Sequence, residues 1–138
     1  MSRISDTLPR KTIIALLFKL ARIDGKLTDQ EVQFIFDTAK RLGLTSGEVE
    51  LIQYQPEQYP LDPPTREVDR MTILYNLLFL MKIDHQISSE EEDMVLGVAI
   101  RLGIRPELAK ELIQVMHTYA KRKIPAHEML DRVRKYMN

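Results

Sequence analysis

Residues 23–31 read IDGKLTDQE and residues 83–91 read IDHQISSEE, and the likeness of these two stretches decides how the chain folds. Each stretch lies between two segments whose apolar residues recur at helical spacing. In each stretch a hydroxyl residue stands three positions before a glutamate, which is the pattern of a capping box at the start of a helix. The sequence therefore predicts two helix–turn–helix junctions of the same design, offset by 60 residues along the chain.

The same offset relates residues well outside the junctions. Identical pairs are Leu17/Leu77, Leu20/Leu80, Ile23/Ile83, Asp24/Asp84, Glu31/Glu91, Ala39/Ala99, Arg41/Arg101, Leu42/Leu102 and Gly43/Gly103. Two copies are too few for a solenoid, which needs at least about three stacked units. We therefore expect an all-α fold of about seven helices, in which two duplicated three-helix units pack on each other about a pseudo-two-fold axis.

The expected elements follow from helical periodicity between Gly and Pro residues. The predicted helices are 8–24, 29–43, 46–54, 66–83, 89–103, 107–121 and 126–137. The chain is interpreted as one domain, 1–138, with repeat one at 8–54, a Pro-rich linker at 55–65, repeat two at 66–121 and a C-terminal helix at 126–137. Helices 8–24 and 66–83 are apolar nearly all round and are expected to lie innermost. The prolines of the linker favour extended or turn backbone.

Composition narrows the function classes. The 138 residues are 44% hydrophobic and 29% charged, which is typical of a globular domain. Lys and Arg together number 20, as do Asp and Glu, so no net charge attracts nucleic acid, and no nucleic-acid partner is expected. The absence of cysteine excludes disulfides and thiolate chemistry and fits a reducing compartment. The apolar run Met71–Met81 is too short to span a membrane, and no signal cleavage site follows residues 13–20. We expect a cytoplasmic protein without a transmembrane segment.

Four acidic residues of the repeated stretches are the candidate site: Asp24, Glu31, Asp84 and Glu91. Asp24 and Asp84 stand at the C-terminal ends of predicted helices, where the helix dipole disfavours a carboxylate. If the two halves pack symmetrically, the four carboxylates converge on an oxygen-only site of the kind that suits calcium or magnesium. In the alternative interpretation each aspartate bonds the amides of its own turn and each glutamate only caps its helix.

An ordinary EF-hand is excluded. The repeated stretches match only the second half of such a loop, and its first and third ligand positions would fall on a leucine and a basic residue in both copies. Zinc is not expected either, because none of the three histidines has a second histidine at ligand spacing.

The doubled motif resembles a known family. A helix that ends in Ile-Asp-Gly, a Leu-Thr-x-x-Glu restart and an Arg-Leu-Gly-Leu run, present in two versions over about residues 10–120, resembles the TerB-like family of tellurite-resistance proteins and the N-terminal domain of the DjlA co-chaperone. The resemblance implies an all-helical fold of two pseudo-symmetric halves. It also implies a bacterial stress-response role, membrane-associated complexes, and a metal site of paired acidic residues at Asp24, Glu31, Asp84 and Glu91. His85 stands where the motif has glycine, which is a departure from the family pattern.

The C-terminal segment differs in charge from the rest of the chain. Residues 119–138 carry six basic and two acidic side chains, and Met129, Val133, Tyr136 and Met137 form an apolar stripe. The expected use of this helix is to pack on its own domain; the alternative is contact with a protein partner or, as a peripheral contact, with an anionic membrane surface.

Three functions follow from these features. The first is a non-enzymatic TerB-like binding module that presents the acidic cluster to a divalent cation or a basic partner segment. The second is a protein–protein adaptor that uses the C-terminal basic helix or the Pro-rich linker, with the acidic residues only capping helices. The third is a small hydrolase with paired carboxylates. We expect no enzymatic activity, since the chain has no phosphate loop, nucleophile elbow or kinase signature.

Overall fold

The computed structural model describes residues 9–136 apart from 24, 26, 84 and 85, and within these residues the secondary structure is entirely helical. The helices are α1 (Arg10–Ala21), α2 (Asp29–Arg41), α3 (Ser46–Tyr54), the short 3-10 helix η1 (Pro56–Gln58), α4 (Glu67–Lys82), α5 (Ser89–Arg101), α6 (Pro106–Thr118) and α7 (Ala126–Lys135). The all-α fold with seven α-helices agrees with the expectation. The outermost predicted positions, 8 and 137, lie outside the described residues.

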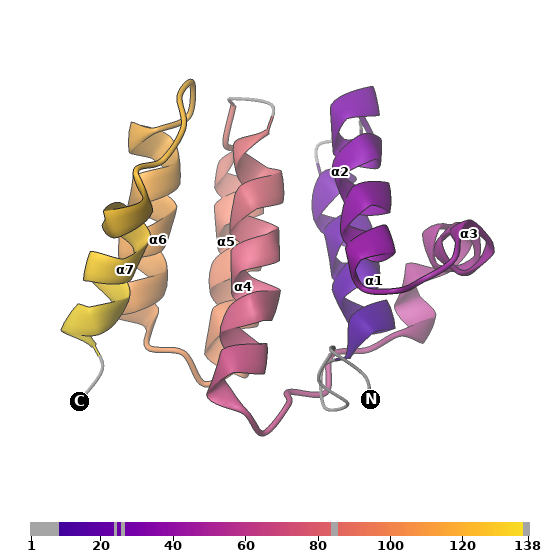
Figure 1. The fold of residues 1–138 in the computed structure, drawn as a ribbon, viewed down its shortest axis with the longest axis horizontal. Coiled ribbons are helices and arrows are strands. Elements are labelled where there is room, and N and C mark those ends of the chain that lie inside the picture. Colours follow the sequence, from indigo (N-terminus) through magenta and orange to yellow (C-terminus); the bar gives the residue numbers. More distant parts are fainter. Residues whose placement is uncertain (1–8, 24, 26, 84–85, 137–138) are drawn as a thin grey trace.

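Helices α1 and α4 form the middle of the molecule and pack on each other more extensively than any other pair in the described part. They run in the same direction in Figure 1, and α2 and α5 return in the opposite direction. The ends of α1 and α4 and the starts of α2 and α5 therefore lie together at the upper end of the molecule, as drawn in Figure 1. This common end is what a face-to-face arrangement of two related halves requires.

The two halves share several local features. In each, the first helix packs on the second and the third, and the second packs on the third. Helices α2 and α5 both have 13 residues, and both begin at a capping box. The third helices differ, because α3 has 9 residues and starts at the cap Thr45, whereas α6 has 13 and starts at Pro106. Internal duplication stays a prediction, and these shared features are consistent with it.

Helices α2 and α5 end two residues earlier than predicted, and glycine explains both ends. Gly43 and Gly103 have φ of 83° and 77°, in the left-handed region that glycine adopts without strain. The amide of the next residue then bonds back to the third-last residue of the helix, Leu44 N to Ala39 O and Ile104 N to Ala99 O, both at 2.9 Å. This is a Schellman motif, which stops the helix although the apolar pattern continues through it.

The core agrees with the expected central position of α1. Eight of the twelve residues of α1 are buried, including Phe18 at 0% exposure. Helix α4 departs from the expectation of burial all round, because Phe79 is 40% and Val68 55% exposed. Val68 lies at the start of α4, whereas Phe79 is exposed near its C-terminal end, where the candidate groove is found.

The Pro-rich linker is attached to the domain. Pro56, Leu61 and Pro64 are buried, and η1 packs on α1 and α3. Arg101 donates a hydrogen bond to Leu61 O at 3.2 Å. The prolines bound the break as expected, and Pro56 begins a short 3-10 helix of three residues.

No helix in the described part of the chain is both long enough and apolar enough to cross a membrane.

Candidate functional site

Glu31 and Glu91, two of the four residues predicted for the acidic site, are buried at the starts of α2 and α5, each 3% exposed. Both form the expected capping boxes. The Glu31 amide donates to Thr28 Oγ1 at 3.1 Å, and the Thr28 amide donates to Glu31 Oε1 at 3.0 Å. In the second copy the Glu91 amide donates to the Ser88 hydroxyl at 3.1 Å, and the Ser88 amide donates to Glu91 Oε1 at 2.9 Å.

These bonds follow from the local sequence. The four leading amides of a helix have no partner within the helix, and a hydroxyl at the cap together with a carboxylate three residues later satisfies two donors at once. Leu27 and Ile87, which precede the caps, pack against the core and fix the entry of the chain into each helix. One oxygen of each glutamate is therefore committed to helix capping.

The other two residues of the predicted site, Asp24 and Asp84, lie outside the described residues. The structure thus brings Glu31 and Glu91 to the same end of the bundle, on separate helices (Figure 1). Within residues 9–136, leaving aside 24, 26, 84 and 85, no three His, Asp or Glu side chains lie close enough together to hold a metal ion. The four-carboxylate site stays a prediction.

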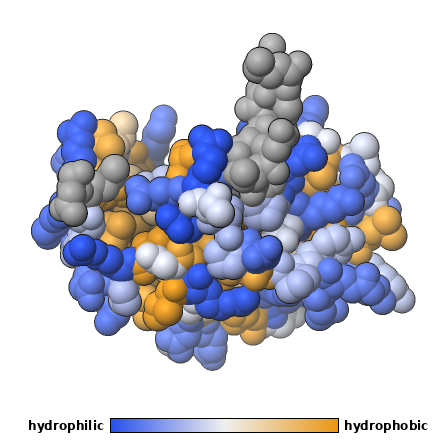
Figure 2. All heavy atoms as spheres, turned by 90° about the horizontal axis from the view of Figure 1, so that it is seen from below, coloured by the Kyte–Doolittle hydropathy of each residue, from blue (hydrophilic) through white to orange (hydrophobic). Residues whose placement is uncertain are grey.

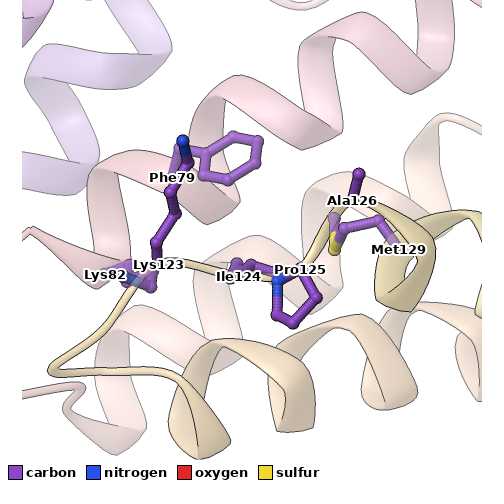
Figure 3. Close-up of a pocket in the computed structure, with 7 residues that line it drawn as sticks. All are labelled: Phe79, Lys82, Lys123, Ile124, Pro125, Ala126 and Met129. Carbon is purple, nitrogen blue, oxygen red and sulfur yellow. The ribbon is translucent and has the colours of Figure 1, made fainter.

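A cavity of about 490 Å³ opens where the exposed part of α4 faces the connection between α6 and α7. We call it the α4/α7 groove; its lining residues are Phe79, Lys82, Lys123, Ile124, Pro125, Ala126 and Met129. Figure 3 shows Phe79 and the two lysines on one side, Ala126 and Met129 of α7 on the other, and Ile124 and Pro125 between them. The groove is therefore apolar along its floor and basic at one edge.

The groove depends on the position of α7, and one carboxylate of α6 makes several of the polar contacts that hold this helix. Glu111 of α6 accepts a hydrogen bond from the Tyr136 hydroxyl and pairs with Lys135 at 3.4 Å and Arg132 at 3.6 Å. The hydrogen bond from Tyr136, followed by the charges of Lys135 and Arg132, holds the pKa of Glu111 below its ordinary value, and Glu111 in turn raises the pKa of Tyr136. No residue of α7 is fully buried.

The apolar stripe of α7 packs on the domain as the sequence predicts. Met129, Val133 and Tyr136 are partly buried against the core, and Met137 lies outside the described residues. Val133 and Tyr136 also line a smaller cavity of about 160 Å³ beside Ile104. Seen from below, the molecule carries mainly hydrophilic side chains, with apolar ones between them across the face (Figure 2).

Sequence reasoning missed the α4/α7 groove. Phe79 lies inside the most apolar run of the chain, which predicts burial, and only the packing of neighbouring helices leaves it exposed. A usable signal was the three-residue basic run at 121–123 immediately before Ile124 and Pro125. This run indicates that the connection before α7 is exposed.

Comparisons of the chain with protein-family models, with curated proteins and with solved structures found no match.

Proposed function

We propose that the chain is a non-enzymatic helical binding module that captures a segment of a protein partner in the α4/α7 groove. The observation that carries this proposal is the exposed aromatic ring of Phe79 at the edge of a cavity of about 490 Å³ with an apolar floor. Ligand-binding clefts of proteins typically measure roughly 300–1,000 Å³ and combine apolar lining with a few placed polar groups. The α4/α7 groove is the surface that this proposal assigns to the adaptor function expected for the C-terminal segment.

The C-terminal helix α7 is a better-supported interaction surface than the Pro-rich linker. The apolar residues Pro56, Leu61 and Pro64 of the linker are buried against its own domain. The start of α7 contributes Ala126 and Met129 to an open cavity. Exposed apolar groups in a concave setting gain more from a partner than residues that are already packed.

The capping role of Glu31 and Glu91 supports the adaptor over the hydrolase. A carboxylate that accepts a bond from the backbone at about 3 Å on each helix contributes to stability in the free protein. A catalytic acid or base instead needs an oxygen that a substrate can reach, and both glutamates are only 3% exposed. We therefore propose no catalytic residues.

Position-specific photo-cross-linking tests this function. A photoreactive phenylalanine analogue is placed at Phe79 or Met129 of the full chain, and at Val68 or Ile100 as exposed apolar controls remote from the groove. The expected result is one protein adduct shared by positions 79 and 129 and absent at 68 and 100, identified by mass spectrometry. Adducts of equal yield at all four positions, or at none, contradict the proposal.

A divalent-cation site is the second candidate function. It is the function that the resemblance to TerB-like proteins, with their two pseudo-symmetric halves, implies. What supports it is that Glu31 and Glu91 are equally buried at the same end of the molecule. A cation present at ten times its dissociation constant stabilises the folded state by about 1.4 kcal/mol. For a chain of 138 residues this raises Tm by roughly 5 °C. Calcium or magnesium at millimolar concentration should give this rise, and Asp24→Asn with Asp84→Asn should remove it. No rise in the parent protein excludes the site.

A further inference from the structure

The charges around the α4/α7 groove define which kind of segment fits it. Lys82 and Lys123 line the groove, and Lys121 and Arg122 are exposed directly before it. Arg122 lies over the Tyr119 ring at 4.5 Å, which holds one of these cations at the surface. The edge of the groove is therefore a basic cluster next to an apolar floor.

The start of α7 adds to this positive potential. Helix α7 begins at Ala126 after Pro125 and has no side-chain cap, so its leading amides and the positive end of its dipole lie beside the groove; Glu128 is the acidic residue of its first turn. The nearby Glu128 is engaged elsewhere, since it pairs with Arg132 at 3.3 Å and with His127 at 3.5 Å. It lines a different cavity, together with Glu111.

We infer, building on the proposed function, that the α4/α7 groove binds an acidic protein segment in which a large apolar side chain is flanked by carboxylates. The apolar side chain would lie among Phe79, Ile124 and Met129, where its burial supplies most of the affinity. The carboxylates would pair with Lys82 and Lys123 and thereby fix the orientation and the choice of partner.

An anionic membrane is the weaker reading of the same charges. An interfacial helix inserts its apolar face into the lipid. The apolar stripe of α7 is instead turned to its own domain, because Met129, Val133 and Tyr136 pack against the core. The exposed large apolar residues Leu51, Tyr54, Val68 and Ile100 lie on α3, α4 and α5 rather than in the basic cluster, and α7 itself exposes one such residue, Leu130. A concave cavity beside one exposed ring suits a single inserted side chain better than a flat bilayer.

Selection from a displayed library of random segments of about twelve residues tests the inference, since grooves of this kind recognise short peptides. The folded full-length chain is the bait, and the doubly substituted Lys82→Gln/Lys123→Gln chain is used for counter-selection. A Lys40→Gln/Lys110→Gln chain is the matched control, because it loses the same charge at exposed positions of α2 and α6. Thermal melting first checks that all three chains are folded.

The expected outcome is enrichment of segments that contain Asp or Glu on both sides of an aromatic residue or leucine. The best such peptide should lose about tenfold in affinity when its carboxylates are changed to amides, when Lys82 and Lys123 are changed, or when salt is raised to about 1 M. The Lys40/Lys110 control should bind it as the parent does.

Two outcomes overturn the inference while leaving the proposed function standing. One is enrichment of segments without acidic residues that still compete at Phe79. The other is binding that is equally strong to the Lys82/Lys123 variant. Binding of the chain to phosphatidylserine vesicles, lost in that variant, with no peptide enrichment, assigns the groove to a membrane and also overturns it. Failure of the proposed function itself is distinguished by the cross-linking experiment, in which positions 79 and 129 would give no shared adduct.

Discussion

Removing the cap hydroxyl of the second junction is the perturbation whose effect the structure defines best. In Ser88→Ala, the Glu91 amide loses the hydroxyl acceptor that it contacts at 3.1 Å. Of the two bonds of the capping box, only the one from the backbone amide of residue 88 to Glu91 Oε1, at 2.9 Å, remains. Loss of such a cap costs about 1 kcal/mol of folding free energy. With roughly 0.3 kcal/mol/K of unfolding entropy for a chain of this length, Tm should fall by roughly 3 °C.

The two copies give an internal comparison. Thr28→Ala should lower Tm by about as much as Ser88→Ala, because the hydrogen-bond distances of the two caps agree within 0.1 Å and their φ and ψ agree within a degree. Glu91→Ala should cost more, about 2 kcal/mol or roughly 7 °C, because the buried side chain and the acceptor of the Ser88 amide are both lost. The double variant Ser88→Ala/Glu91→Ala should cost less than the sum of the singles, since the pair acts as one unit.

Differential scanning calorimetry at neutral pH measures these values, and Thr45→Ala serves as the control at the exposed box of α3. The reasoning is refuted if Ser88→Ala leaves Tm within about 1 °C of the parent, or if the double variant costs the full sum of the single variants. Either result would mean that Ser88 and Glu91 do not stabilise the start of α5 as one capping box.

Three further predictions concern the rest of the molecule. Gly103→Ala should lower the free energy of unfolding by about 1–2 kcal/mol, because a φ of 77° strains any residue other than glycine. Gly97→Ala, in the exposed middle of α5 with open space around the new Cβ, should raise the free energy of unfolding by about 0.5–1 kcal/mol. Urea unfolding measures both changes. Phe18→Ala should cost about 3–5 kcal/mol in the same assay, because the ring is fully buried in α1. The lowered pKa of Glu111 means that its contribution to stability is present above about pH 4.5 and is lost as pH falls through the lowered value, so hydrogen-exchange protection of α7 should drop below that pH while α1 and α4 stay protected. The raised pKa of Tyr136 gives the opposite dependence: its contribution to stability is present below about pH 10 and is lost as pH rises through the raised value. Equal loss of hydrogen-exchange protection in α7 and α1 at either pH limit would contradict the role of Glu111 and Tyr136 in holding α7 on α6.

The sequence predicts the helix starts well because caps are local. Thr28, Thr45 and Ser88 each stand three residues before a glutamate, and all three boxes form. The helix ends are predicted less well, because the apolar spacing continues into Leu42 and Leu102 as if the helix did. What stops each helix is the backbone freedom of the following glycine, which periodicity does not detect.

The candidate functional residues also differ in how far the sequence predicts them. The capping role of Glu31 and Glu91 follows from residues within three positions of each. The α4/α7 groove depends on contacts between segments that are far apart in the chain, α4 and the residues before α7, and on Phe79 being left open by the packing of its neighbours. No short-range pattern contains that information, and the basic run at 121–123 indicates only that the connection is exposed.

The most direct test of the binding module is to map where the cross-linked partner segment contacts the chain by NMR. Titration of the labelled protein with that segment should shift the amide signals of Phe79, Lys123 and Met129 and leave those of Thr28 and Ser88 at the capping boxes unchanged. Shifts centred on the two capping boxes, with the groove signals unchanged, would contradict the account and favour the acidic site predicted from the sequence.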